Sequence, residues 1–134
     1  MKLMTLRNSA IAGATALGLL AAGVAFATTS IRLNVATAPG TTAPGNNVTV
    51  TGAPFPSGAI LPADVTVSVA TSCGDAPVAT TPATAVTTII GSTRRVKFTV
   101  PAGLSSATYA VSIAGVSVGG EDFTSSNCSN MQVL

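Results

Sequence analysis

The chain has 134 residues, enough for a single domain, and carries six Lys or Arg, four Asp or Glu and no histidine. The absence of histidine removes the usual general base of Ser-His and Cys-His nucleophilic sites. With four Phe, one Tyr and no Trp, the chain also offers few side chains for a sugar-stacking surface.

The first 27 residues have the pattern of a secretory signal peptide. Lys2 and Arg7 form a basic start, residues 10–24 are apolar, and Ala25-Phe26-Ala27 is an A-x-A cleavage site. The apolar stretch is shorter than the ~20 residues that span a bilayer, which favours cleavage over the alternative of an uncleaved anchor. We therefore expect bacterial export to the extracellular space or cell surface, with one domain at residues 28–134 and no membrane segment after cleavage.

Cleavage also changes the charge of the protein. Without Lys2 and Arg7, four basic residues remain against the four acidic ones, so the formal net charge becomes zero. A chain without a basic field lacks the electrostatic attraction that nucleic-acid binding requires. A weakly charged, neutral surface also resists self-association poorly, which favours a protein that assembles with copies of itself.

Two cysteines, Cys73 and Cys128, are the only ones in the chain. In an exported protein the pair is expected to form one disulfide, and closing a loop of about 55 residues contributes on the order of 4 kcal/mol in the chain-entropy model. Two free thiols or intermolecular bridges are the alternatives.

After the signal, the chain reads as short strands between turns. Ile31, Leu33 and Val35 alternate with other residues and predict a first strand. Residues 37–47 contain Pro-Gly twice and predict a loop, followed by a strand at 47–51. The proline-rich residues 53–63 are irregular, with Phe55 closing one end of the core, and residues 64–71 form the next clear strand.

The second half continues this pattern. Residues 76–84 read as an edge segment or a loop, and residues 86–90 as a short strand. Residues 94–100 and 108–113 both alternate apolar and polar side chains on either side of Pro101-Ala102-Gly103, which predicts an antiparallel pair. Met131 and Val133 mark a last strand. About seven short strands and no helix predict an all-β, immunoglobulin-like antiparallel β-sandwich.

Two segments resemble the IPT/TIG family of immunoglobulin-like domains. Asn46-Asn47-Val48-Thr49-Val50-Thr51-Gly52, with Phe55 soon after, is similar to the opening strand of that family. Phe98-Thr99-Val100-Pro101-Ala102-Gly103-Leu104, followed by Thr108-Tyr109-Ala110-Val111-Ser112-Ile113, is similar to its later strands and turn. Over residues 30–134 the resemblance implies a spacer, adhesive or interaction module, usually without catalysis, and assigns no functional residues.

Candidate chemistry is sparse, and we expect no enzyme activity and no cofactor. The four carboxylates formally allow a two-carboxylate glycosidase, but each lies beside a turn or a glycine, where carboxylates are ordinarily solvated. Glu121-Asp122 could contribute to a calcium site but more simply forms a polar loop. Arg94, Arg95 and Lys97 are either a solvated strand face or a polyanion contact. Tyr109 is expected in the core rather than on a sugar-binding surface.

Two functions remain from the sequence. The first is a non-catalytic subunit of an extracellular filament, surface layer or matrix that assembles by β-strand addition. Residues 28–36, with Ile31, Leu33 and Val35, are the candidate donor strand, although the same residues could form the first strand of their own sandwich. The second is a monomeric binding module for a polysaccharide or a cell-surface partner.

Overall fold

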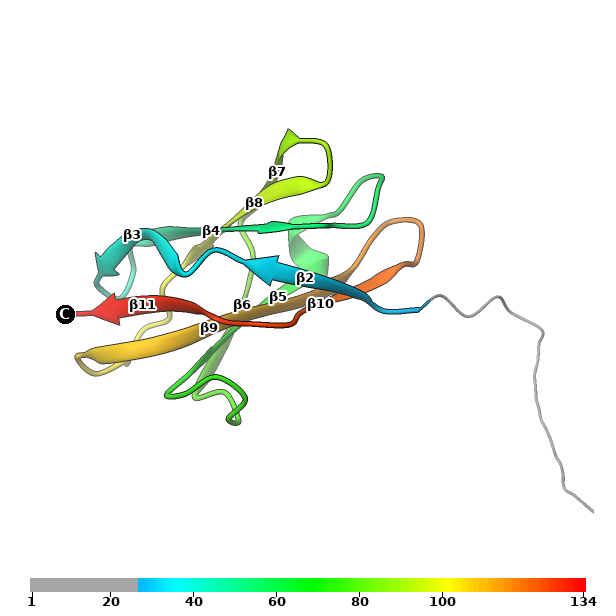
Figure 1. Ribbon diagram of the computed structural model, residues 1–134. Coiled ribbons are helices and arrows are strands. Elements are labelled where there is room, and N and C mark those ends of the chain that lie inside the picture. Colours follow the sequence, from blue (N-terminus) through cyan, green and yellow to red (C-terminus); the bar gives the residue numbers. More distant parts are fainter. Residues whose placement is uncertain (1–26) are drawn as a thin grey trace, which may run out of the picture.

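The computed structural model describes residues 27–134, which form an all-β domain (Figure 1). The predicted signal peptide, with Ala25 of its cleavage site, lies outside the described residues except for Ala27. The strands are β2 (Thr29–Leu33), β3 (Ala36–Thr42), β4 (Asn47–Ala53), β5 (Val65–Ala70), β6 (Ala79–Pro82), β7 (Ala85–Ile90), β8 (Thr93–Thr99), β9 (Ala107–Val116), β10 (Asp122–Ser125) and β11 (Ser129–Val133). A 3-10 turn, η1 (Pro62–Asp64), precedes β5.

The strands form two layers with the order of an immunoglobulin-like sandwich. In one layer β2 pairs with β4, β4 with β8, and β8 with β7. In the other, β10 and β11 pair with β9, β9 with β5, and β5 with β6. In the letters of the immunoglobulin fold, β2 is A, β4 is B, β5 is C, β7 is D, β8 is E, β9 is F, and β10 with β11 is G. The two layers then have the strand orders A-B-E-D and G-F-C of that fold, and β6 is an extra strand beside C. The predicted all-β sandwich is confirmed.

One side of the sandwich is closed by the first part of the chain, and here the pairing departs from the antiparallel prediction. β2 pairs with β4 in one layer and, in parallel, with β10 in the other. β3 likewise pairs with β4 and, in parallel, with β11. The N-terminal and C-terminal strands run side by side in the same direction, so the domain has two parallel pairings among antiparallel ones.

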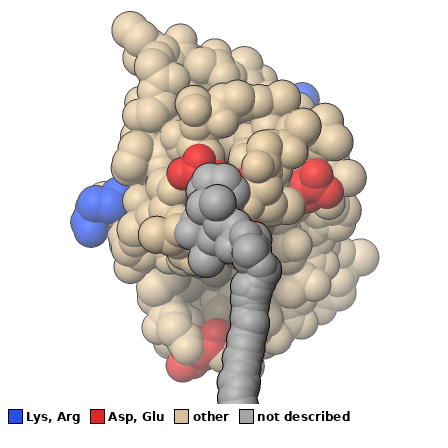
Figure 2. Space-filling view, turned by 90° about the vertical axis from the view of Figure 1, so that its right-hand side faces the viewer, with Lys and Arg blue, Asp and Glu red and all other residues tan. Residues whose placement is uncertain are grey.

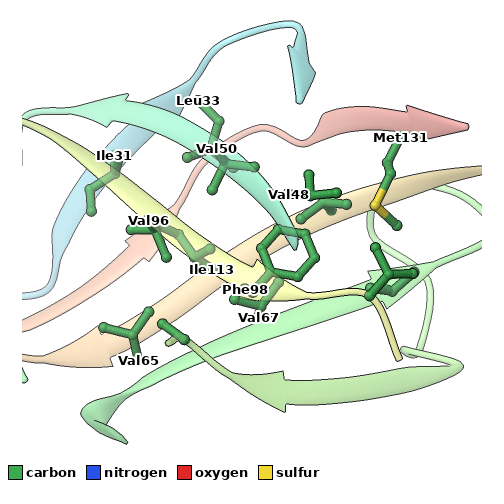
Figure 3. Packing of buried hydrophobic residues seen from close by; sticks show 14 of the residues in the cluster. Ile31, Leu33, Val48, Val50, Val65, Val67, Val96, Phe98, Ile113 and Met131 are labelled. Atoms are coloured by element: carbon green, nitrogen blue, oxygen red, sulfur yellow. The ribbon is translucent and has the colours of Figure 1, made fainter. Parts of the chain in front are cut away.

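The core lies between the layers and consists of the inward residues of the alternating strands (Figure 3). The predicted inward residues of the third clear strand, Val65, Val67 and Val69, are fully buried. Phe55 closes one end of the core as expected, and its ring lies edge-on to Phe123 at a centroid distance of 5.4 Å. The complete set is Ile31, Leu33, Val48, Val50, Phe55, Ile60, Val65, Val67, Val69, Ala83, Val96, Phe98, Val100, Tyr109, Val111, Ile113, Phe123, Met131 and Val133.

The predicted pairing of residues 94–100 with 108–113 is wrong. β8 pairs with β4 and β7, whereas β9 pairs with β5, β10 and β11 in the opposite layer. The connection between them, residues 100–106, is longer than a tight hairpin turn and crosses from one sheet to the other, a spacing of about 10 Å. The two alternating faces were identified correctly, but they face each other across the core instead of lying side by side.

The loop predicted for residues 37–47 is also wrong in its first half, because residues 36–42 form β3. Pro39 and Gly40 fit there because the pairing is sparse. β3 meets β4 at Ala38, and its register with β11 shifts between Ala36 and Thr41. Residues inside such an irregularity donate no ladder hydrogen bonds, so proline and glycine are tolerated.

Candidate functional site

The predicted donor segment, residues 28–36, is divided in two by a bend. Ile31 and Leu33 are buried in the core of their own sandwich, with exposed fractions of 0% and 5%. In Figure 3 both point toward the core that Val50 and Val96 also fill. Val35 lies in the bend between β2 and β3 and is 75% exposed, so it is not part of the alternating face. The buried face of this segment therefore consists of Ile31 and Leu33.

The strand β2 lies between β4, β10 and the Asn127 side chain, and we call this site the β2 socket. Gly52 of β4 lies in this socket, beneath the two buried side chains of β2. A Cβ on Gly52 would lie 2.9 Å from Ile31 Cγ2 and 2.9 Å from Leu33 Cδ2, closer than van der Waals contact allows. The backbone of Gly52 pairs with Leu33 in the ladder. The absence of a side chain at this position thus lets both apolar side chains of β2 reach the core.

Asn127 holds the other side of β2 and was not identified from the sequence. Its Oδ1 accepts a hydrogen bond from the Leu33 backbone N–H at 2.7 Å, and its Nδ2 donates to the Leu33 carbonyl at 2.9 Å. The amide side chain therefore pairs with Leu33 as a neighbouring strand would. Ser126 adds a backbone hydrogen bond to the Ile31 carbonyl, at 2.7 Å. The position next to Cys128 was the only available hint of this role.

The backbone pairing that holds β2 is nevertheless short. Two residues, Arg32 and Leu33, are in register with β4, and three residues, Thr29 to Ile31, are in register with β10. Most of what fixes β2 is thus the burial of Ile31 and Leu33 together with the Asn127 contact. Another copy of the same strand would make the same contacts, because every partner of β2 belongs to the rest of the sandwich.

The predicted disulfide joins Cys73 to Cys128, with a Cα–Cα distance of 5.8 Å. It ties the turn after β5 to the segment before β11. The bond borders an open hollow of about 260 Å³. Polar residues line this hollow beside the disulfide, namely Asp75, Ser112, Thr124, Ser125, Ser126 and Asn127.

The basic cluster separates into one buried and two exposed side chains. Arg95 and Lys97 lie on the outward face of β8 and are exposed. Arg94 instead points inward, 9% exposed, and donates hydrogen bonds to the carbonyls of Pro56 and Gly58. Arg94 thus anchors the irregular segment after β4. Of this basic cluster, Arg95 and Lys97 are the side chains that remain available to a partner. Figure 2 shows how sparse and how widely separated the charged side chains are on one end of the domain.

The remaining candidate residues have structural contacts. Tyr109 is buried at the start of β9, and its hydroxyl donates to the Ser105 carbonyl at 2.8 Å, as in the tyrosine corner of immunoglobulin-like domains. It is a core residue and offers no sugar-stacking face. Glu121 accepts a hydrogen bond from the Thr29 hydroxyl. Within residues 27–134, no three His, Cys, Asp or Glu side chains are grouped to hold a metal ion.

No helix in the described part of the chain is long and apolar enough to cross a membrane. No protein-family model matches the sequence, and no curated protein matches it either.

Proposed function

We propose that this protein is an exported, non-catalytic structural domain that assembles with copies of itself into an extracellular filament, surface layer or matrix. The observation that carries the proposal is the way β2 is held. This five-residue strand supplies two buried side chains to a socket built by other strands, and each of its residues is in register with a single neighbouring strand, β10 or β4. The IPT/TIG resemblance of residues 30–134 supports an interaction module of the same kind.

The mechanism we propose is exchange of β2 between neighbouring copies. The exposed bend at Asn34 and Val35 connects β2 to β3 and would act as the hinge. When β2 of one copy occupies the socket of the next, Ile31 and Leu33 recover the burial that they have in the monomer. If each copy gives its β2 to the next copy, the subunits form a filament. A head-to-tail contact that does not close into a ring can be repeated without end.

A pair of engineered cysteines tests this exchange. Arg32 of β2 lies directly opposite Ala53 of β4, so the double variant Arg32→Cys/Ala53→Cys can form a disulfide across the pair. If strands exchange, the bond joins different chains and gives a ladder of covalent oligomers on a non-reducing denaturing gel. If every bond forms within one chain and only monomer is seen, β2 is not the donor.

The matched control uses two strands that belong to the body of the sandwich. Thr51 of β4 lies opposite Arg95 of β8. The variant Thr51→Cys/Arg95→Cys should form its bond within one chain whether or not β2 is exchanged between copies. A ladder from this control would show that the oligomers of the test variant come from random oxidation.

Export is proposed on the pattern of residues 1–27 and is supported by the disulfide, since such bonds persist in oxidising compartments. Expression in a bacterial host with an intact secretion pathway should place the protein outside the cytoplasm. Its first residue, determined by N-terminal sequencing, should be Thr28. Retention of Met1 in the exported fraction would contradict cleavage after Ala27.

A second candidate function, a monomeric binding module for a polysaccharide or cell-surface partner, is favoured by the polar hollow beside the disulfide. Its hydroxyl groups and the Asp75 carboxylate offer both donors and acceptors to a hydroxyl-rich ligand. This function predicts a monomer at all concentrations and saturable binding of an oligosaccharide. Loss of that binding in Asp75→Ala, with an unchanged elution volume, would distinguish it from self-assembly.

A further inference from the structure

The two layers of the sandwich are closed on one side and open on the other. β2 and β3 close one side by pairing with both layers. On the opposite side the outermost strands are β6 and β7, and within residues 27–134 each pairs with a single neighbour, β6 with β5 and β7 with β8. Figure 1 shows β7 at the border of its layer. A border strand of this kind presents unpaired N–H and C=O groups that another strand can bond.

β6 is protected in the ways that natural border strands usually are. It has four residues, ends at Pro82 and is preceded by Pro77. Short length and proline both discourage the addition of another strand. β6 is therefore a poor site for pairing between molecules.

β7 lacks these protections. Its six residues, Ala-Val-Thr-Thr-Ile-Ile, include no charge and no proline, and β-branched residues occupy five of the six positions. Ile89 and Ile90 are exposed, Ile90 by 76%. A register shift between Thr88 and Ile90 makes the strand irregular at its end, so the regular part is Ala85–Thr88. The regular part of β7 is thus an uncharged border strand rich in β-branched residues and followed by exposed isoleucines, which is suited to pairing with another strand.

We infer that β7 is a contact between two copies of this chain, in which the two β7 strands pair antiparallel about a two-fold axis. This inference rests on the proposed self-assembly and names the surface for one of its contacts. A two-fold axis perpendicular to the sheet keeps the outward faces of both copies on the same side. We place the axis at Thr87, the exposed one of the two central residues of Ala85–Thr88, so that Thr87 lies opposite Thr87 of the second copy. The β4-β8-β7 sheet then continues across both molecules.

The charges next to β7 favour a second copy over a charged partner. Arg95 and Lys97 of β8 lie opposite Thr87 and Ala85, on the outward face and not at the border. In the paired dimer the two β8 strands are three strand spacings apart, about 14 Å. This exceeds the Debye length of about 8 Å at physiological salt, so repulsion between the two sets of cations is weak. The uncharged edge strand β7 is therefore suited to another uncharged edge strand, and β7 of a second copy provides it.

The test is a single cysteine at the two-fold axis. Directly opposite residues of antiparallel strands have Cα atoms about 4.5–5.5 Å apart, within the range that a disulfide bridges. The variant Thr87→Cys should therefore form a covalent dimer under mild oxidation, at a rate at least about tenfold above that of Thr80→Cys. Thr80 is an exposed threonine of β6 and provides the matched control.

A second variant measures the contact without oxidation. Thr87→Glu places a carboxylate opposite Arg95 of its own chain, which preserves the β7–β8 pair, and beside the same carboxylate of the second copy. Like charges directly opposite each other are unfavourable, so this variant should raise the dimer dissociation constant at least about tenfold in sedimentation experiments. Thr80→Glu should leave the dissociation constant unchanged. If the wild-type protein associates but neither Thr87 variant differs from its Thr80 control, the β7 contact is wrong and the proposed self-assembly stands. If the wild-type protein stays monomeric at all concentrations and Thr87→Cys does not cross-link, both are wrong.

Discussion

The missing side chain of Gly52 creates the space in which Ile31 packs. A Cβ on Gly52 would lie 2.9 Å from Ile31 Cγ2, and the nearest backbone atom, the Arg32 carbonyl oxygen, would be 3.0 Å away. The first strand of the domain thus depends on a glycine in the strand beside it.

We predict that Gly52→Ala destabilises the protein by about 1–3 kcal/mol, the usual cost of forcing an extra carbon into a packed core. Urea unfolding followed by far-UV circular dichroism measures the change. Gly40→Ala is the control, because its Cβ would meet nothing closer than 3.8 Å, and it should be neutral or slightly stabilising. Equal stability of the wild type and Gly52→Ala would show that β2 does not pack as described.

Asn127→Ala should loosen β2 specifically. Both hydrogen bonds to the Leu33 backbone are lost, and leaving such groups unpaired costs about 1–3 kcal/mol each when they are buried. Hydrogen exchange should accelerate at Leu33 and at its β2 neighbours while β5 and β9 keep their protection. In Asn130→Ala, an exposed asparagine on β11, exchange at Leu33 should remain slow. Uniform acceleration in both variants would contradict a local role for Asn127.

Arg94 and Arg95 are adjacent in sequence but should respond differently to the same substitution. Arg94→Met leaves the carbonyls of Pro56 and Gly58 without their donor and should cost about 1–3 kcal/mol. Arg95→Met changes an exposed side chain and should stay within about 0.5 kcal/mol of the wild type. Thermal or urea unfolding of the two variants, measured under the same conditions as the wild type, gives the loss of unfolding free energy for each. A larger loss for Arg95→Met would contradict the inward orientation of Arg94.

The disulfide should contribute on the order of 4 kcal/mol, because it closes a loop of 55 residues in the unfolded chain. The double variant Cys73→Ser/Cys128→Ser should therefore unfold at a much lower urea concentration than the oxidised wild type. Adding reductant should lower the midpoint of the wild type and leave that of the double variant unchanged. Reductant-sensitive unfolding of the double variant would exclude the disulfide as the cause.

Period-two alternation predicted which side chains face the core, because burial of one sheet face requires it. Val65, Val67 and Val69 of β5 and Val96 and Phe98 of β8 are buried as the pattern indicated. The pattern says nothing about which strands are neighbours. β8 and β9 therefore looked like a hairpin but lie in opposite layers, since the length of the connection allows either arrangement.

The residues that shape the proposed site were harder to predict, because their roles depend on distant partners. Asn127 is 94 residues from Leu33 in the sequence, and no local pattern reveals their contact. Arg94 is the second residue of β8 and shares the inward face with Val96 and Phe98, so alternation indicates its direction. Its acceptors do not follow from any local pattern, because the carbonyls of Pro56 and Gly58 lie 38 and 36 residues away in the sequence. Val35 continued the alternation in the sequence, but the chain bends there between β2 and β3, which leaves its side chain exposed.

Self-assembly is the central claim, and the size of the protein in solution tests it most directly. Sedimentation velocity of the exported, non-reduced protein over a wide concentration range, with negative-stain microscopy of the same samples, gives the answer. We expect large species that grow with concentration and visible filaments or sheets. A single sharp boundary at the monomer mass at every concentration, with no assemblies on the grid, would contradict the account and leave the polar hollow beside the Cys73–Cys128 bond as the feature to pursue.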